Sequence, residues 1–244
     1  MVRKSRKSRE EWKIYNNVFD QFTTRGIYEL SSKGYFKDLK SSLALGKEAN
    51  VFTAEKDDGD LVIVKIYRLE NCNFNKMYSY INADPRFTGL DNQKRKIIFS
   101  WVQREFKNLS LARQKCRVPT PIVHKNNILV MSFVGYEDYA APPLKDAEPE
   151  NIESFYKEVI SQIKNLISTG VVHGDLSEFN ILNHDELPVL IDFSQGTSIK
   201  AFDAKELLER DMRNVTNYFK KRMKLDVEGE IKAVLDFFEK SINV

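Results

Sequence analysis

The chain has 244 residues, 42% of them hydrophobic, and a formal net charge of +3. This length suits one or two small domains, and the apolar fraction is sufficient for a sizeable core. No apolar run approaches a membrane span, the N-terminus lacks a secretory apolar segment, and Cys72 and Cys116 lack the spacing of a metal site. We therefore expect free thiols, a cytoplasmic location and no membrane association.

Residues 1–12 are predicted to form a basic, flexible N-terminal tail. The cationic side chains of this tail include Arg3, Lys4, Arg6, Lys7 and Arg9. Such a cluster attracts phosphate backbones without reading a base sequence, so an RNA partner is one interpretation. The other is a solvated tail that binds nothing.

The N-terminal lobe is expected over residues 13–135 and contains an antiparallel sheet. A turn at residues 46–49 leads into a strand over residues 50–54, and Gly46 and Lys47 are its candidates for covering nucleotide phosphates. The turn has one Gly and lacks the Walker pattern, so taken alone it predicts only a hairpin.

Residues 62–66 are apolar and β-branched apart from Lys65, which predicts a strand with one embedded Lys. A buried Lys needs a partner or an anion, and a Lys in this pattern contacts the α- and β-phosphates of a nucleotide. Its expected partner is Glu105, on a following helix. The apolar stripe of that helix is formed by Trp101, Phe106 and Leu109. The alternatives are a Lys on the wet face of an edge strand and an ordinary exposed Glu.

Residues 71–96 lie between Lys65 and Glu105 and show no sustained hydrophobic period. We expect a flexible loop here, because long irregular segments inside compact domains are usually functional or disordered. Its available hydroxyl side chains are Ser79 and Thr88.

Residues 128–135 predict a buried strand that runs into a Gly-containing break. If a second lobe follows, this break is an inter-lobe hinge where backbone groups bind adenine. The candidates are the carbonyl of Ser132 and both backbone groups of Val134, with the side chain of Met131 behind the base. The alternative is a core strand that ends in a turn.

The strongest signal is a polar loop at residues 173–180, followed after a short hairpin by Asp192. Asn180 and Asp192 supply oxygen ligands for a hard divalent cation, which leaves Asp175 to accept the proton of an attacking hydroxyl. This spacing predicts a phosphoryl-transfer site of the protein-kinase type that uses a divalent cation, Mg²⁺ or alternatively Mn²⁺. Incidental acidic residues in a solvated loop are the competing interpretation.

The C-terminal lobe is expected over residues 136–244 and is mainly helical, with helices over residues 151–168 and about 203–220 and a last helix around residues 231–238. Only about 50 residues follow Asp192, enough for two or three average helices. We therefore predict an α+β, two-lobed, protein-kinase-like fold whose reduced C-terminal lobe lacks an activation segment and peptide-binding helices.

Six motifs of the chain resemble the RIO family of atypical protein serine kinases. They are Gly-Lys-Glu-Ala at 46–49, Trp-x-x-x-Glu-x-x-Asn-Leu at 101–109, Met-Ser-Phe-Val-Gly at 131–135, Pro-Pro-Leu-Lys-Asp at 142–146, His-Gly-Asp-Leu-Ser-Glu-Phe-Asn at 173–180 and Asp-Phe-Ser-Gln-Gly at 192–196. The resemblance runs from about residue 40 to about residue 222. Residues 176–180 are specific to the family, whereas the preceding His-Gly-Asp is shared with small-molecule kinases.

The resemblance implies ATP and magnesium, serine phosphorylation or ATP hydrolysis, and a role in maturing the small ribosomal subunit, with a subunit precursor or its RNA as partner. By position, Asp175 would be the catalytic aspartate, Asn180 and Asp192 the metal ligands, and Lys65 and Glu105 the ion pair at the phosphates. The loop after Lys65 can carry an autophosphorylation site in this family. In some members the metal-binding aspartate itself takes the phosphate, which would make an acyl phosphate at Asp192.

Two departures from the family pattern are visible. Ala44 and Leu45 replace two hydroxyl residues that usually precede the phosphate-covering turn, so any contact through those side chains is absent. No winged-helix domain precedes the kinase core, which favours the subgroup that lacks it.

Two other functions compete with this interpretation. A small-molecule kinase of the aminoglycoside or choline type shares the His-Gly-Asp pattern, but needs a larger second lobe to enclose its substrate. A ribosome-assembly factor whose nucleotide state switches its affinity, with little phosphotransfer, needs the same ATP site.

Overall fold

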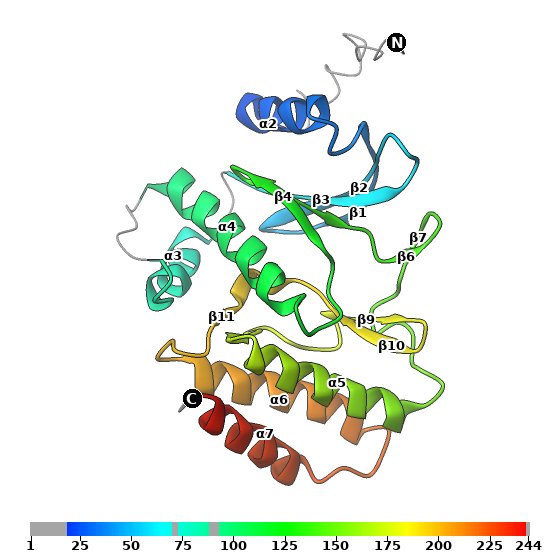
Figure 1. Ribbon diagram of the computed structural model, residues 1–244, viewed down its shortest axis with the longest axis vertical. Helices are drawn as coiled ribbons and strands as arrows, with labels where there is room; N and C mark the ends of the chain where they lie inside the picture. The colour runs from blue at the N-terminus through cyan, green and yellow to red at the C-terminus, as the bar shows by residue number, and fades with distance from the viewer. Residues whose placement is uncertain (1–18, 70–72, 88–92, 243–244) are drawn as a thin grey trace.

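The structure, a computed structural model, describes residues 19–69, 73–87 and 93–242, which form two lobes (Figure 1). The basic tail of residues 1–12, together with Cys72 and Thr88, lies outside the described residues. The upper lobe in Figure 1 contains a sheet and the lower lobe is mainly helical, as the sequence predicts.

A five-stranded antiparallel sheet with the order β1-β2-β3-β5-β4 forms the N-terminal lobe. The strands are β1 (Asp38–Leu45), β2 (Ala49–Glu55), β3 (Leu61–Tyr67), β4 (Pro121–Lys125) and β5 (Ile128–Ser132). Because β3 pairs with β2 on one side and β5 on the other, Lys65 lies on a central strand. This placement removes the edge-strand alternative for Lys65.

The two faces of the sheet have different partners, because successive side chains of a strand point to opposite sides. One face packs against α2 (Gln21–Ser32), which begins at Asp20, where the carboxylate accepts the backbone N–H groups of Phe22 and Thr23. This cluster contains Ile27, Leu30, Val62, Val64 and Val130. The alternate residues of β3 face the long helix α4 (Lys94–Ala112) and the rest of the molecule.

The segment between β3 and α4 contains a helix, α3 (Phe74–Ala83), where the sequence analysis predicted a loop over residues 71–96. The side chain of Asn73 caps its first turn, and Met77 and Ile81, one turn apart, are buried against the main core. The prediction was wrong for these residues because the apolar spacing is helical but lasts only ten residues. On α4, Trp101 and Leu109 are buried as expected, whereas Phe106 is only half-buried.

Three helices form the C-terminal lobe in the described part of the chain: α5 (Ile152–Ser168), α6 (Ala204–Lys220) and α7 (Val227–Ile242). All three were predicted from their apolar stripes. Short strand pairs and one 3₁₀ turn lie between this layer and the sheet: β6 (Gly135–Tyr136) with β7 (Tyr139–Ala140), β8 (Val171–Val172) with β11 (Thr197–Ser198), β9 (Ile181–His184) with β10 (Leu187–Leu190), and η1 (Phe193–Gln195).

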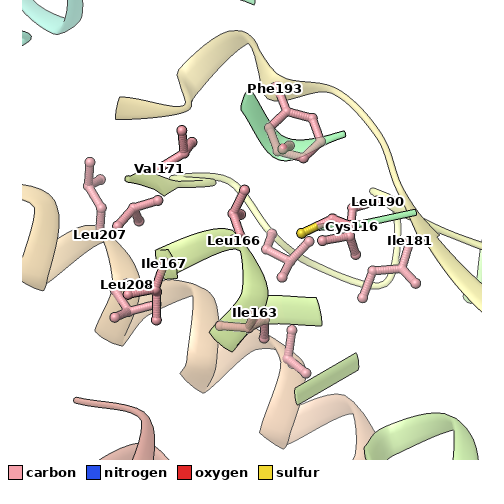
Figure 2. Packing of buried hydrophobic residues seen from close by; sticks show 14 of the residues in the cluster. Cys116, Ile163, Leu166, Ile167, Val171, Ile181, Leu190, Phe193, Leu207 and Leu208 are labelled. Atoms are coloured by element: carbon pink, nitrogen blue, oxygen red, sulfur yellow. The ribbon is translucent and has the colours of Figure 1, made fainter. Parts of the chain in front are cut away.

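The core of the C-terminal lobe extends to the loops that contain Asp175 and Asp192. Figure 2 shows Phe193, the first residue of η1, above a cluster that includes Leu166 of α5, Val171 of β8 and Leu207 of α6. Phe193 is fully buried, so it anchors the segment that follows Asp192. None of the described helices is both long enough and apolar enough to span a membrane.

Candidate active site

A buried polar cluster links β3 to α4. Lys65 Nζ lies 2.8 Å from Glu105 Oε1, and the hydroxyl of Tyr67 donates to Glu105 Oε2 at 2.5 Å. Lys65 and Tyr67 share one face of β3 because they are two residues apart. Burial raises the pKa of the Glu105 carboxyl, and the Lys65 ammonium opposes that rise. The sequence predicted the pairing of Lys65 with Glu105 but not the contribution of Tyr67.

The same ammonium contacts the second lobe. Lys65 Nζ lies 2.8 Å from Asp192 Oδ1, and the side chain of Asp192 is 40% exposed. Burial alone would raise the pKa of this carboxyl, but the Lys65 ammonium outweighs burial and lowers it to about 2. Asp192 is therefore ionised at neutral pH.

The backbone of Asp192 has a left-handed conformation, with φ of 61°. This value is uncommon for a residue other than Gly, although Asp tolerates it better than most. The turn η1 begins at once, and the N–H of Ser194 points to Asp192 Oδ1 at 3.4 Å. The local backbone therefore aims this carboxylate at Lys65 and at the loop that contains Asp175.

Asp175 and Asn180 lie in the loop between β8 and β9. Asn180 Nδ2 donates to the backbone carbonyl of Asp175 at 2.8 Å, and the carbonyl of Asn180 accepts the N–H of Ile191 at 3.0 Å. The amide nitrogen of Asn180 is thus committed, and its amide oxygen is the atom available to a cation. Partial burial raises the pKa of Asp175, with a further increase from Asp192 and an opposing decrease from Arg210.

Helix α6 holds this loop from below. Asp211 is 2% exposed and accepts the N–H groups of Gly174 at 2.7 Å and of Leu176 at 2.9 Å. Burial raises the pKa of Asp211 to about 7, although the two N–H groups oppose that rise. Arg210 donates to the carbonyl of Gly174. Sequence reasoning missed both residues, because a polar pair on an amphipathic helix carries no local signal.

His173 connects the loop to the strand before Asp192. Its Nε2 lies 2.9 Å from the carbonyl of Ile191, and its ring packs against Phe193 at 4.6 Å between centroids. Burial lowers the pKa of His173 to about 4, so the ring is neutral at pH 7 and Nε2 donates to that carbonyl. Its role here is to support the loops rather than to carry charge.

The turn after β1 contains Gly46 and Lys47. The N–H of Gly46 donates to the carbonyl of Ala49 at 2.9 Å, and a Cβ on Gly46 would lie 2.8 Å from that oxygen. Gly is therefore required by a close approach of the backbone. Lys47 is exposed. Glu48 is close enough to add a small increase to the pKa of Asp175, after the effects of burial and Asp192.

The hinge candidates lie at the end of β5. Met131 is 8% exposed and belongs to the main core. The N–H of Ser132 donates to the carbonyl of Thr120 at 2.8 Å. The carbonyl of Val134 accepts the N–H of Ala141 at 3.0 Å, so only its second lone pair could serve a base. Both backbone groups of Val134 are expected to bind adenine, and the carbonyl is the weaker candidate because it already accepts the N–H of Ala141.

The oxygen donors at this site fit a nucleotide-bound magnesium ion. Mg²⁺ is usually bound by one or two protein oxygens together with phosphates and water, rather than by an all-protein cage. Asn180 and Asp192 provide such a set, and within the described ranges no group of three or more His, Cys, Asp or Glu side chains could hold a metal on its own.

The fold and the site define a protein-kinase-like enzyme. A family model described as the RIO domain matches residues 50–240. The chain belongs to the RIO family, and it is an enzyme of the serine/threonine protein kinase class.

Relatives and solved structures agree with this assignment. RIO-type serine/threonine-protein kinases Rio1 of Haloferax volcanii and Methanocaldococcus jannaschii are each 39% identical, over 92% and 91% of this chain and 77% of each relative. The human serine/threonine-protein kinase RIO1 is 31% identical over 83% of this chain and 37% of its own length. The Rio2 kinase–ADP/Mg²⁺–phosphoaspartate complex from Chaetomium thermophilum has a TM-score of 0.67 at 20% identity, covering 91% of this chain and 75% of that one. The last comparison supports the kinase fold alone.

Proposed function

We propose that this chain transfers the γ-phosphate of ATP to a serine hydroxyl or to water, with Mg²⁺ held by Asn180 and Asp192. The observation that carries this proposal is the position of Lys65 Nζ, 2.8 Å from both Glu105 and Asp192. In this arrangement Lys65, the proposed phosphate-binding residue of one lobe, contacts Asp192, the proposed metal ligand of the other. The ADP and Mg²⁺ in the Rio2 complex support the choice of nucleotide and ion.

Each residue has a distinct role in the proposed reaction. Lys65, oriented by Glu105, binds the α- and β-phosphates. Asp175 accepts the proton of the attacking hydroxyl, and its raised pKa makes it a stronger base than an exposed Asp. When bound, Mg²⁺ neutralises charge on the phosphates. The groups proposed to cover the phosphates and bind adenine are Gly46 and Lys47, and Met131, Ser132 and Val134.

Asp192 is a second candidate acceptor. Its carboxylate oxygen would attack the γ-phosphorus, ADP would leave with the electrons of the broken P–O bond, and water would then hydrolyse the acyl phosphate. The carboxylate is ionised, with a pKa of about 2, and its side chain is 40% exposed. The phosphoaspartate in the Rio2 complex supports this route by analogy.

We place this activity in the cytoplasm, in maturation of the small ribosomal subunit, with a subunit precursor or its RNA as partner. The basic residues of the N-terminal tail support contact with RNA. Autophosphorylation belongs to the same proposal, and Ser79 is an exposed candidate on α3. A nucleotide-switched assembly factor with little phosphotransfer is the second candidate, because it needs the same site.

The experiment that tests the proposal measures phosphate release and protein labelling from γ-labelled ATP, with and without small-subunit precursors. The wild type is compared with Asp175→Ala. Asp175-dependent labelling of a serine supports a protein kinase. Precursor-stimulated release with little labelled acceptor supports an ATPase switch. Release and labelling that Asp175→Ala leaves unchanged would contradict the role of Asp175 as the base.

A further inference from the structure

A buried polar network begins at Asp84, just after α3. Asp84 is fully buried, and Arg86 donates to it from Nε at 2.9 Å and from Nη2 at 2.6 Å. Arg104 of α4, itself 1% exposed, adds a contact from Nε at 3.3 Å. A buried carboxylate is tolerated only when it is paired and hydrogen-bonded in this way. The network thus fixes the end of α3 against α4.

The same network continues to residues 192–196, called the metal loop here because they begin with the proposed metal ligand Asp192. Arg86 Nη2 donates to Asn108 Oδ1 at 2.8 Å. Asn108 Nδ2 in turn donates to the carbonyl of Phe193 at 3.0 Å and to the carbonyl of Gly196 at 2.7 Å. Arg104 Nη2 lies 3.5 Å from the carbonyl of Gln195. Three carbonyls of the four residues that follow Asp192 therefore accept contacts from side chains of α4.

Space around this turn is tight. A Cβ on Gly196 would lie 2.7 Å from Asn108 Nδ2, so the turn and the amide touch closely. Asn108 is fully buried. Because Asp192 has φ of 61° and leads directly into η1, a shift of the turn would redirect its carboxylate.

We propose that Arg86 and Asn108 are positioning residues for Asp192, and that residues 84–87, which follow α3, take the place of an activation segment in fixing the metal loop. Arg86 orients the Asn108 amide, and that amide holds the two ends of the turn. The inference rests on the proposed function in so far as Asp192 is taken to bind metal.

The first test measures hydrogen exchange in the nucleotide-free protein for Arg86→Ala. The matched control is Arg222→Ala, because Arg222 also pairs with a carboxylate, that of Glu148, and its side chain is 25% exposed against 22% for Arg86. We expect exchange over residues 192–198 to rise at least about 10-fold in Arg86→Ala and not in Arg222→Ala, while β2 and β3 stay protected. An equal rise throughout the chain, or no rise over residues 192–198, would overturn the inference.

Asn108→Asp provides the second variant. It keeps the volume and can still accept from Arg86, but it loses the donor to the two carbonyls. We expect the same local rise in exchange, whereas protection equal to the wild type would contradict the role of Asn108.

Metal binding separates the inference from the proposed function. Mn²⁺ binding is measured by electron paramagnetic resonance with a non-hydrolysable ATP analogue. We expect Arg86→Ala to weaken Mn²⁺ about 10-fold, as substitutions behind metal ligands do, while metal-free nucleotide affinity stays within about 2-fold. Unchanged Mn²⁺ affinity would overturn the positioning of Asp192. Failure of the wild type to bind Mn²⁺ would instead contradict the proposed metal site, and the exchange result would still decide whether the turn is held by Arg86.

Discussion

Lys65 Nζ lies midway between two carboxylates, 2.8 Å from Glu105 Oε1 and 2.8 Å from Asp192 Oδ1. Glu105 is 1% exposed and belongs to α4, whereas the side chain of Asp192, in the other lobe, is 40% exposed. Glu105 thus has no solvent to stabilise its charge and depends on Lys65 and Tyr67. Asp192 is open to a cation on its exposed side.

Replacement of Lys65 should affect stability and activity through different partners. In Lys65→Met, Glu105 loses its countercharge in a buried site, which should lower the free energy of unfolding by about 3–5 kcal/mol. Turnover should fall at least about 100-fold, because phosphate binding is lost. Chemical denaturation and phosphate release from ATP measure the two effects.

The double variant Lys65→Met/Glu105→Gln is the control for this prediction. With no buried charge left unpaired, it should recover most of the lost stability and none of the activity. Recovery of turnover in the double variant would contradict the assignment of Lys65 to the phosphates.

Tyr67→Phe should isolate the second hydrogen bond of Glu105. The hydroxyl of Tyr67 donates to Glu105 Oε2 at 2.5 Å, and Tyr67 is 1% exposed. Its removal should lower the free energy of unfolding by roughly 1–3 kcal/mol, as for a hydrogen bond to a charged group. Turnover should change much less than in Lys65→Met, because the Lys65 contacts remain. A loss of turnover as large as that of Lys65→Met would show that Tyr67 acts in the reaction itself.

The parts of the site that lie close together in sequence were accessible to prediction. Asp175, Asn180 and Asp192 occupy two neighbouring loops, and their spacing alone indicates a cation and phosphate site. Lys65 was detectable because a single Lys in an apolar strand needs an anionic partner. The structure brings Lys65 into contact with both Glu105 and Asp192, and it joins Asn180 to the backbone of Asp175.

The supporting residues were not accessible, for a physical reason. Asp211 accepts a hydrogen bond from the loop that contains Asp175, although it lies 35 residues beyond Leu176 in the sequence. Asn108 donates to the turn after Asp192, although it lies 85 residues before Phe193. In the sequence of an amphipathic helix, Asp211 and Asn108 look like any other polar residue beside an apolar stripe. Helix α3 was missed because its helical apolar spacing, which includes Met77 and Ile81, lasts only ten residues.

Removal of residues 1–9 should weaken RNA binding in a salt-dependent way. The deleted segment carries five cationic side chains, so the slope of log affinity against log salt should become shallower by up to about 4. Turnover of ATP without RNA should stay unchanged. Fluorescence anisotropy with small-subunit RNA, at several salt concentrations, measures the slope, and equal slopes would show that the tail is not a contact.

Asp211 should make stability depend on pH in a direction opposite to that of most carboxylates. Burial raises its pKa to about 7 in the folded protein, from an ordinary value of 3.8, so folding favours proton uptake between these values. This group therefore lowers the free energy of unfolding as pH rises from about 4 to about 7, by an amount on the order of a few kcal/mol, and has no further effect above that range.

Asp211→Asn cannot titrate and leaves one backbone N–H facing an amide donor, which should lower the free energy of unfolding by about 1–3 kcal/mol at pH 4. The deficit of Asp211→Asn relative to the wild type should then shrink towards pH 7, as measured by urea denaturation at a series of pH values. A deficit that stays constant or grows with pH would mean that the pKa of Asp211 is not raised in the folded protein, because its two N–H donors offset or outweigh burial.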